Sequence, residues 1–202
     1  NFDYDKFLTD QNLEVELDEG GLVFLDADEA YHSDYVHLDI KPNVTSEKYF
    51  PTMNTGLKEI AKALSCDAKI AAHPRSDYKN KPCKFFLPIL KDQTFDLIKR
   101  ARVIVSHGST ALQWAIVMRK PIILVTTEEM KKSIFNQTTE AFAYTLGKSI
   151  VNLDRFPCEY DWESELFVDE TKYKNYIETY IKQSGTPEKL VWDIVIDRME
   201  ND

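Results

Sequence analysis

Residues 102–125 read RVIVSHGSTALQWAIVMRKPIILV, and this stretch predicts a strand, a tight turn, a helix and a second strand. Arg102–Ser106 and Pro121–Val125 are continuous apolar runs rather than alternating ones, a pattern typical of strands buried on both faces of a parallel sheet. Thr110–Met118 is apolar nearly all round, which indicates a buried helix. The stretch therefore predicts one strand–helix–strand crossover.

The same order of short apolar run and amphipathic helix continues on both sides. A stripe running from Tyr49 to Leu64 at spacings of three and four predicts a long helix; Ser46 is its expected cap, and Pro51 predicts a later start or a distorted first turn. Phe95–Ala101 predicts a short helix. The other predicted strands are Gly21–Asp26, Ala68–Ala72, Lys84–Leu87 (the weakest) and Ser149–Leu153. Together they predict an α/β fold, a Rossmann-like doubly wound parallel sheet of about six strands.

With 202 residues the chain is long enough for one domain. We expect a lead-in over residues 1–20, the α/β core over 21–155 and a helical extension over 156–202. In that extension Tyr173, Tyr176 and Tyr180 share one face, and Thr186-Pro187 predicts the start of a second helix. The tyrosine face predicts a partly wet position between this domain and another. The alternative is that both helices merely cover this domain's own sheet.

Composition limits the classes of partner. The net charge of −9 disfavours broad binding to nucleic acid or to an anionic membrane, and no apolar run approaches the ~20 residues of a membrane span. We expect at most a peripheral membrane association. Cys66, Cys83 and Cys158 are scattered without metal-ligand spacing, which predicts a reducing, cytoplasmic compartment.

Polar side chains follow four of the predicted strands. Because ligands of open parallel sheets bind beyond the carboxyl ends of the strands, we expect these side chains to line one cleft. They are Asp26, Asp28 and Glu29 after the first strand, His73, Arg75 and Tyr78 after the second, Ser106 to Thr110 after the fourth, and Thr126 and Thr127 after the fifth.

The segment Ser106-His107-Gly108-Ser109-Thr110 predicts a phosphate site. Gly108 permits a tight turn, and the helix that follows exposes unpaired N–H groups at its amino end, where hydroxyls add further hydrogen bonds. The alternative is that Ser109 merely caps the helix.

His73-Pro74-Arg75 predicts a second contact to the same phosphates. Arginine presents a planar fork that suits phosphate, and histidine adds a donor or a titratable group. The alternative is a histidine and an arginine in a surface loop. For the acidic cluster of Asp26, Asp28, Glu29, His32 and Asp34, three interpretations stay open: a loop lining the cleft, solvated acids, or a magnesium site.

Three segments carry a resemblance to the carboxyl halves of bacterial surface- and capsular-polysaccharide glycosyltransferases with the GT-B architecture. They are Phe24-Leu-Asp26, Ala71–Tyr78, and Val103–Ala111 through Lys120–Leu124, within residues 21–130. His73-Pro74 resembles the HP motif of sialyl- and polysialyltransferases. Ser109-Thr110 resembles the paired-hydroxyl motif shared with the CDP-glycerol transferases.

The resemblance implies that His73, Ser109 and Thr110 contact the phosphates of a CMP-, CDP- or UDP-linked nucleotide sugar. It also implies a saccharide acceptor, no required cofactor or metal, and an amino-terminal domain that supplies the catalytic base. Since the chain starts at Asn1 and not at Met, we expect a fragment of a two-domain protein that binds donor without turnover. Gln113 or Trp114 stands where many relatives place a ribose-binding glutamate, which leaves the nucleotide open. Asp18-Glu19-Gly20 spells the sialyltransferases' acidic motif, but it lies just ahead of a strand and is assigned no role.

Two other functions stay open. Val23–Asp28 resembles the strand and DxD signature of haloacid-dehalogenase-type phosphatases, with Asp26 as nucleophile, Asp28 as acid/base and Ser106 as the hydroxyl motif. Against it, Ala30 departs from that pattern and no later strand ends in paired aspartates. The other is a non-catalytic nucleotide-binding or epimerase-like module.

Overall fold

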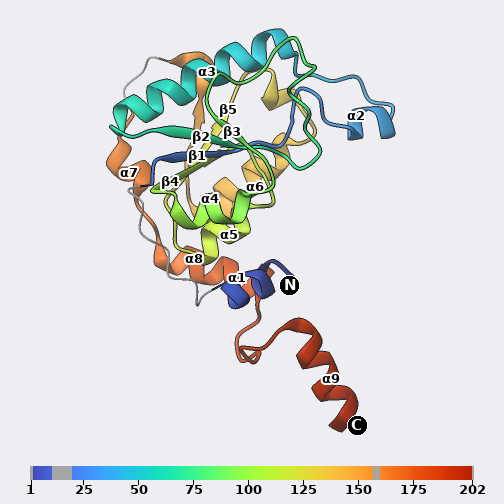
Figure 1. The fold of residues 1–202 in the computed structure, drawn as a ribbon. Coiled ribbons are helices and arrows are strands. Elements are labelled where there is room, and N and C mark those ends of the chain that lie inside the picture. The colour runs from blue at the N-terminus through green and yellow to red at the C-terminus, as the bar shows by residue number, and fades with distance from the viewer. Residues whose placement is uncertain (1, 11–19, 157–159, 202) are drawn as a thin grey trace.

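The computed structural model describes residues 2–10, 20–156 and 160–201, and their core is a six-stranded sheet flanked by helices (Figure 1). The strand order is β3-β2-β1-β4-β5-β6, and every pairing is parallel. This confirms the predicted doubly wound, Rossmann-like sheet. The strands are β1 (Leu22–Leu25), β2 (Ala68–Ala71), β3 (Ile89–Leu90), β4 (Val103–Ser106), β5 (Ile122–Thr126) and β6 (Ile150–Asn152).

The chain reverses its winding direction between β1 and β4, which lie side by side at the centre of the sheet. Leu25 at the end of β1 is level with Ala71 of β2 and with Ser106 of β4. The carboxyl ends of these three strands therefore share one edge, where an open sheet of this kind binds its ligands.

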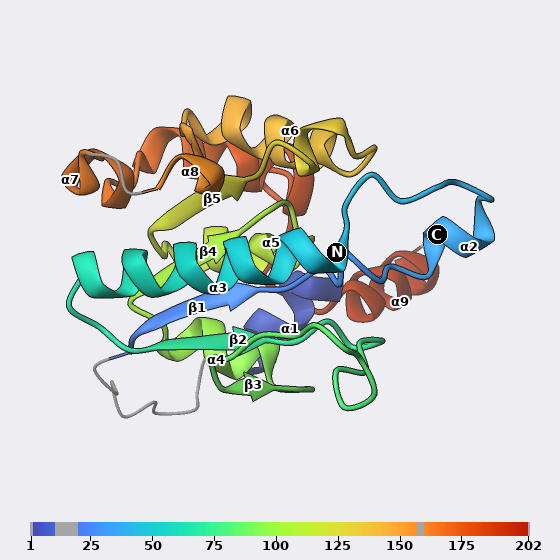
Figure 2. The same ribbon diagram turned by 90° about the horizontal axis from the view of Figure 1, so that it is seen from above.

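Helices cover both faces of the sheet, as Figure 2 shows from above. One face packs against α3 (Ser46–Ala63), with Tyr49, Met53, Leu57 and Ile60 buried between helix and strands. The other face packs against α4 (Thr94–Arg100), α5 (Leu112–Val117), α6 (Asn136–Leu146) and α8 (Glu170–Tyr176). The remaining elements are α2 (Asp34–His37), α7 (Trp162–Leu166), the 3-10 turns Met130–Lys132 and Leu153–Arg155, and the π-helical turn Ile177–Ile181.

The third predicted strand was placed too early. Lys84–Leu87 is a loop, and β3 begins at Ile89. The side chain of Asn54 on α3 satisfies this loop's backbone, because its amide donates to Lys84 O at 3.1 Å and its oxygen accepts from Phe86 N at 2.8 Å. Phe85 is 3% exposed whereas Phe86 is 85% exposed. The apolar run therefore places one phenylalanine in the aromatic core and does not pair with the sheet.

The predicted start of the long helix was also wrong. Helix α3 begins at Ser46, and Thr45 is its cap residue, so Ser46 is not the cap. Pro51 lies inside the helix on its exposed side and neither delays the start nor ends it. A proline here removes one backbone hydrogen bond, and the continuous buried stripe from Tyr49 onward outweighs that loss. Helix α5 likewise begins at Leu112 and not at Thr110.

The carboxyl-terminal tyrosines do not form one interdomain face. Tyr173 is fully buried and its hydroxyl donates to Lys120 O at 3.0 Å, while Tyr176 stacks on Phe142 of α6 at 5.7 Å between ring centroids. Tyr180 alone is exposed, at 59%. Two of the three tyrosines therefore pack onto this domain's own helices.

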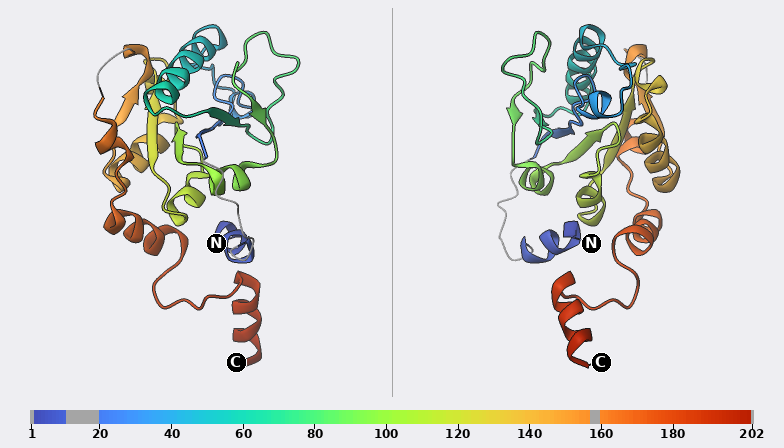
Figure 3. Two further views of the ribbon diagram at one scale, coloured as in Figure 1. Left: turned by 60° about the vertical axis from the view of Figure 1, so that its left-hand side comes forward. Right: turned by 90° about the vertical axis from the view of Figure 1, so that its right-hand side faces the viewer.

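The last helix, α9, runs from Val191 to Asn201 and extends away from the sheet (Figures 1 and 3). The predicted start at Thr186-Pro187 is wrong, because the carboxylate of Asp5 accepts the hydrogen bond of Val191 N, at 3.1 and 3.2 Å. Asp5 belongs to α1 (Phe2–Asp10), which lies between α9 and the body of the domain. Exposed apolar side chains gather on these two helices: Phe2, Trp192, Val195, Ile196 and Met199.

Parts of two predictions lie outside the described residues: most of the second half of the lead-in, with Asp18 and Glu19, and the segment that holds Cys158. Within the described ranges, no helix has the length and apolar character needed to cross a membrane.

Candidate functional site

A cleft of about 500 Å³ opens at the carboxyl edge of the sheet, on the side covered by α4 and α5. It lies over the ends of β1, β2 and β4, where the winding direction changes. Its lining is drawn from five segments of the chain: Asp3, Lys6, Leu25, Asp26, Ala71, Ala72, His73, Pro74, Asp92, Thr94, Phe95, Ser109, Thr110, Ala111 and Trp114.

The turn between β4 and α5 brings Ser109 and Thr110 into the cleft. Gly108 has a φ of +101°, and a Cβ added there would lie 2.9 Å from Thr139 Oγ1 and 3.0 Å from Thr139 N, so the position requires glycine. Ser106 Oγ accepts from Ser109 N at 3.2 Å, and Ser109 Oγ accepts from Ala111 N at 3.3 Å. These bonds fix the turn before any ligand arrives. Ser109 does not cap α5, because the cap residue of that helix is Ala111 and, among the described residues, no side chain accepts from its first turn.

His73 reaches the same cleft from the end of β2. Its Nδ1 accepts from Arg75 N at 3.3 Å, which leaves Nε2 to carry the proton of the neutral ring. Burial lowers the pKa of His73, with smaller contributions from His32 and Arg75. Near neutral pH His73 is therefore a neutral hydrogen-bond donor.

Asp26 lies at the floor of the cleft and is 3% exposed. Its Oδ1 accepts from Asp28 N at 3.0 Å, and its Oδ2 accepts a short hydrogen bond from the hydroxyl of Tyr78. The two hydrogen bonds stabilise the carboxylate and lower the pKa of Asp26, but burial has the larger effect and raises that pKa to about 7. A carboxyl group poised near neutral pH in a cleft is a candidate functional group.

Five predicted site residues are buried in the core instead. His107 bonds Tyr49 through Nε2 at 2.8 Å and packs on Phe24, and burial lowers its pKa to about 4. Ser106 is buried beneath the turn that it holds. Glu29, Thr126 and Thr127 are also buried and bond neighbouring loops. Glu29 accepts from the hydroxyls of Ser133 and Tyr35, Thr126 donates to the side chain of Asn136, and Thr127 accepts from Met130 N. These five residues shape the edge of the sheet and do not line the cleft.

Four other predicted residues lie close to the cleft without lining it. Arg75 is exposed and its guanidinium is 3.5 Å from Ser33 Oγ. Asp28, with a φ of +54°, and Tyr78 both donate hydrogen bonds to Asp26, and neither residue lines the cleft. Gln113 is half-buried on α5, beyond the residues that line the cleft.

The sequence interpretation missed the contribution of α1. Asp3 and Lys6 line the cleft, with Asp3 O accepting from Trp114 Nε1 at 2.9 Å and Lys6 Nζ 5.1 Å from the centre of the Phe95 ring. A short amphipathic helix at a chain end carries no sign of its docking site. Asp92, with a φ of +61°, follows β3 and was missed because that strand was placed too early.

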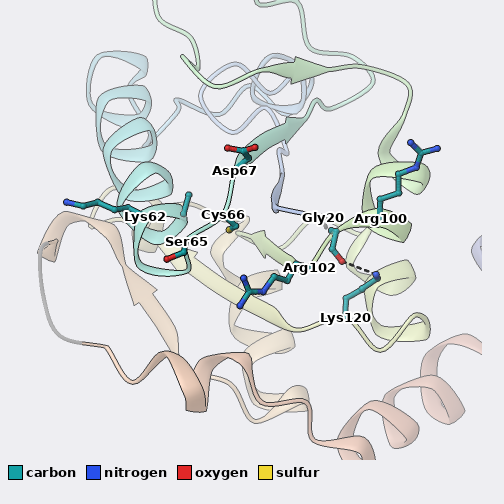
Figure 4. A pocket seen from close by; sticks show the side chains of 10 residues that line it. Gly20, Lys62, Ser65, Cys66, Asp67, Arg100, Arg102 and Lys120 are labelled. Atoms are coloured by element: carbon teal, nitrogen blue, oxygen red, sulfur yellow. Dashed lines mark hydrogen bonds between the residues drawn. The ribbon is translucent and has the colours of Figure 1, made fainter. Parts of the chain in front are cut away.

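A larger hollow of about 810 Å³ lies at the opposite, amino edge of the sheet (Figure 4). Two of its cations cap helices: Lys120 Nζ donates to Lys99 O and Ala101 O at 2.7 and 2.9 Å, and Arg102 Nη1 donates to Leu64 O at 3.1 Å. Lys62 and Arg100 point away from its centre in Figure 4. The positive charges of this hollow therefore either bond backbone carbonyls or point away from it, and the hollow is not the candidate site.

The geometry gives little support to the phosphatase interpretation. Both oxygens of Asp26 already accept hydrogen bonds, and Ser106 is fully buried, so neither is presented as that chemistry needs. Within the described residues, no group of three histidine, cysteine or acidic side chains is arranged to hold a metal ion.

Comparison with known proteins assigns no family, because no family model matches the chain and no curated protein matches it significantly. The choice of function therefore depends on the cleft and on the residues that line it.

Proposed function

We propose that the cleft binds the phosphates of a nucleotide sugar and that this chain is the donor-binding part of a glycosyltransferase of surface-polysaccharide synthesis. One observation carries the proposal. His73, Ser109 and Thr110, the three residues that the resemblance to HP-motif and paired-hydroxyl transferases assigns to donor phosphates, line a single cleft at the carboxyl edge of the sheet.

The chemistry of these three residues suits a leaving phosphate. In glycosyl transfer the bond from the anomeric carbon to the phosphate oxygen breaks, and its electron pair stays on the phosphate. The hydroxyls of Ser109 and Thr110 and the Nε2–H of His73 are donors for that charge, and the preformed turn removes the cost of ordering them. The acceptor in this proposal is a saccharide hydroxyl.

The proposal predicts binding of CMP, CDP or UDP, with weaker binding when a donor is removed. His73→Ala and Thr110→Val are each expected to lose about 1–3 kcal/mol of binding free energy, the range for a hydrogen bond to a charged group. Calorimetric titration of the chain with the three nucleotides at pH 6 measures these losses.

Lys62→Ala is the matched control, since Lys62 lies at the amino edge of the sheet. The proposal is wrong if none of the three nucleotides binds at millimolar concentration, or if the control weakens binding as much as the two cleft variants do.

A further inference from the structure

The charges around the cleft do not suit an anion at first sight. Its described lining contains three carboxyl groups, on Asp3, Asp26 and Asp92, against the single ammonium group of Lys6. Lys6 already pairs with Asp10 at 2.6 Å, and the pKa of His73 is lowered, so that its ring adds no full charge near neutral pH. A phosphate placed here meets an excess of negative charge unless one carboxyl group is neutral.

Asp26 is the carboxyl group of the three that most affects a bound phosphate. It follows β1, at the centre of the sheet, between the strand ends that carry His73 and the Ser109–Thr110 turn. It is 3% exposed, so water screens its charge poorly, whereas Asp92 is exposed and Asp3 is half-buried. Of the three acids, Asp26 therefore repels a phosphate most strongly when it is ionised.

We propose that the anionic ligand binds with Asp26 in its neutral, protonated form, so that a chain in which Asp26 is ionised takes up one proton from solvent onto this carboxylate when the ligand binds. The inference rests on the proposed function, because it concerns the same cleft and the same phosphates. It adds Asp26 to the residues that select the ligand and makes affinity depend on pH.

The surroundings of Asp26 favour this protonation. Burial already raises its pKa to about 7, and a phosphate close by raises that pKa further, because a second negative charge disfavours the carboxylate. Lys6 is the one cation that opposes this effect from within the described lining. The titratable groups that face Asp26 or its partners come from five parts of the chain: Asp3 and Lys6 of α1, Asp28, Glu29 and His32 after β1, Tyr49 of α3, His73, Tyr78 and Lys81 after β2, and Lys91 and Asp92 after β3.

The test compares the wild-type chain with Asp26→Asn, which keeps the shape of the side chain and cannot ionise. The probe is whichever of CMP, CDP and UDP binds the wild type most tightly, titrated at pH 6, 7 and 8. The ratio of the two dissociation constants cancels the ionisation of the nucleotide and of His73. With a pKa of about 7 for Asp26, linkage predicts a ratio near one at pH 6 and wild-type binding about tenfold weaker than the variant at pH 8.

Two further variants sharpen the result. Asp92→Asn, the matched control, removes another carboxylate of the same cleft and is expected to change affinity by a factor that does not vary with pH. Tyr78→Phe keeps Asp26 but removes a donor that stabilises its charge, which moves the loss of affinity to higher pH; this variant tests the inference even if Asp26→Asn does not fold.

A ratio that stays constant from pH 6 to pH 8, or weaker binding by Asp26→Asn than by the wild type at pH 8, overturns the inference while leaving the proposed function in place. If no nucleotide binds the wild type at any of these pH values, the proposed function itself fails.

Discussion

Two histidines follow strands at the same edge of the sheet, yet their environments differ completely. His73 lines the cleft, whereas His107 is 3% exposed and bonded to Tyr49. The sequence predicted both as phosphate ligands, His107 as part of the Ser106–Thr110 turn and His73 as part of the His73-Pro74-Arg75 segment. The difference lies in the turn after each strand: the turn after β4 packs Gly108 against Thr139 and leaves His107 buried against Phe24 and Tyr49, whereas the turn after β2 leaves His73 in the lining of the cleft.

The burial of His107 predicts a loss of stability in acid. Its pKa is lowered to about 4 in the folded chain, so the unfolded chain takes up the proton first as pH falls below the ordinary value of 6.5. The free energy of unfolding that neutral His107 contributes is complete above pH 6.5 and declines as pH falls toward 4. The expected loss is about 2–3 kcal/mol, since each tenfold change in proton affinity is worth about 1.36 kcal/mol.

Urea unfolding at pH 7 and pH 4.5 measures this effect, with His107→Gln as the comparison because glutamine cannot take up the proton. The stability of the wild type relative to the variant is expected to fall between the two pH values. Parallel losses in both proteins would mean that His107 is not the group responsible.

Helices and strands were predictable in kind, but their ends were not. The apolar runs gave five of the six strands nearly in place, and the stripe from Tyr49 gave α3. The misplaced boundaries depend on distant partners: Asn54 satisfies the backbone of the Lys84–Leu87 loop, and Asp5 caps α9. A local pattern contains no information about a partner far away in the sequence.

The cap of α9 is testable. Asp5→Ala removes the acceptor of Val191 N and is expected to cost about 0.5–2 kcal/mol of local stability, the usual worth of a helix cap. Hydrogen exchange of the amides in the first turn of α9 measures the loss. Lys6→Ala is the control, because Lys6 lies on the side of α1 that faces Phe95 of α4. Unchanged α9 protection in Asp5→Ala would show that the helix does not depend on this contact.

At the scale of the whole molecule, the alternation of strands and helices was enough to predict the doubly wound sheet, and a cleft opens at the edge where the predicted site residues follow the strands. The alternation was not enough to predict that α1 and α4 complete the cleft through Lys6, Asp3 and Phe95. Those contacts arise only when the chain end docks on α5, so a site built from the strand ends alone was incomplete.

The central claim is that nucleotide phosphates bind at the carboxyl edge of this sheet. The most direct test is to follow the backbone amide resonances of the isotope-labelled chain while UDP or CDP is added at pH 6. We predict progressive shifts at His73 and at Ser109 to Ala111, with Lys62, Ser65 and Arg102 at the amino edge unaffected. Shifts confined to the amino-edge residues, with none in the Ser109–Ala111 turn, would contradict the claim.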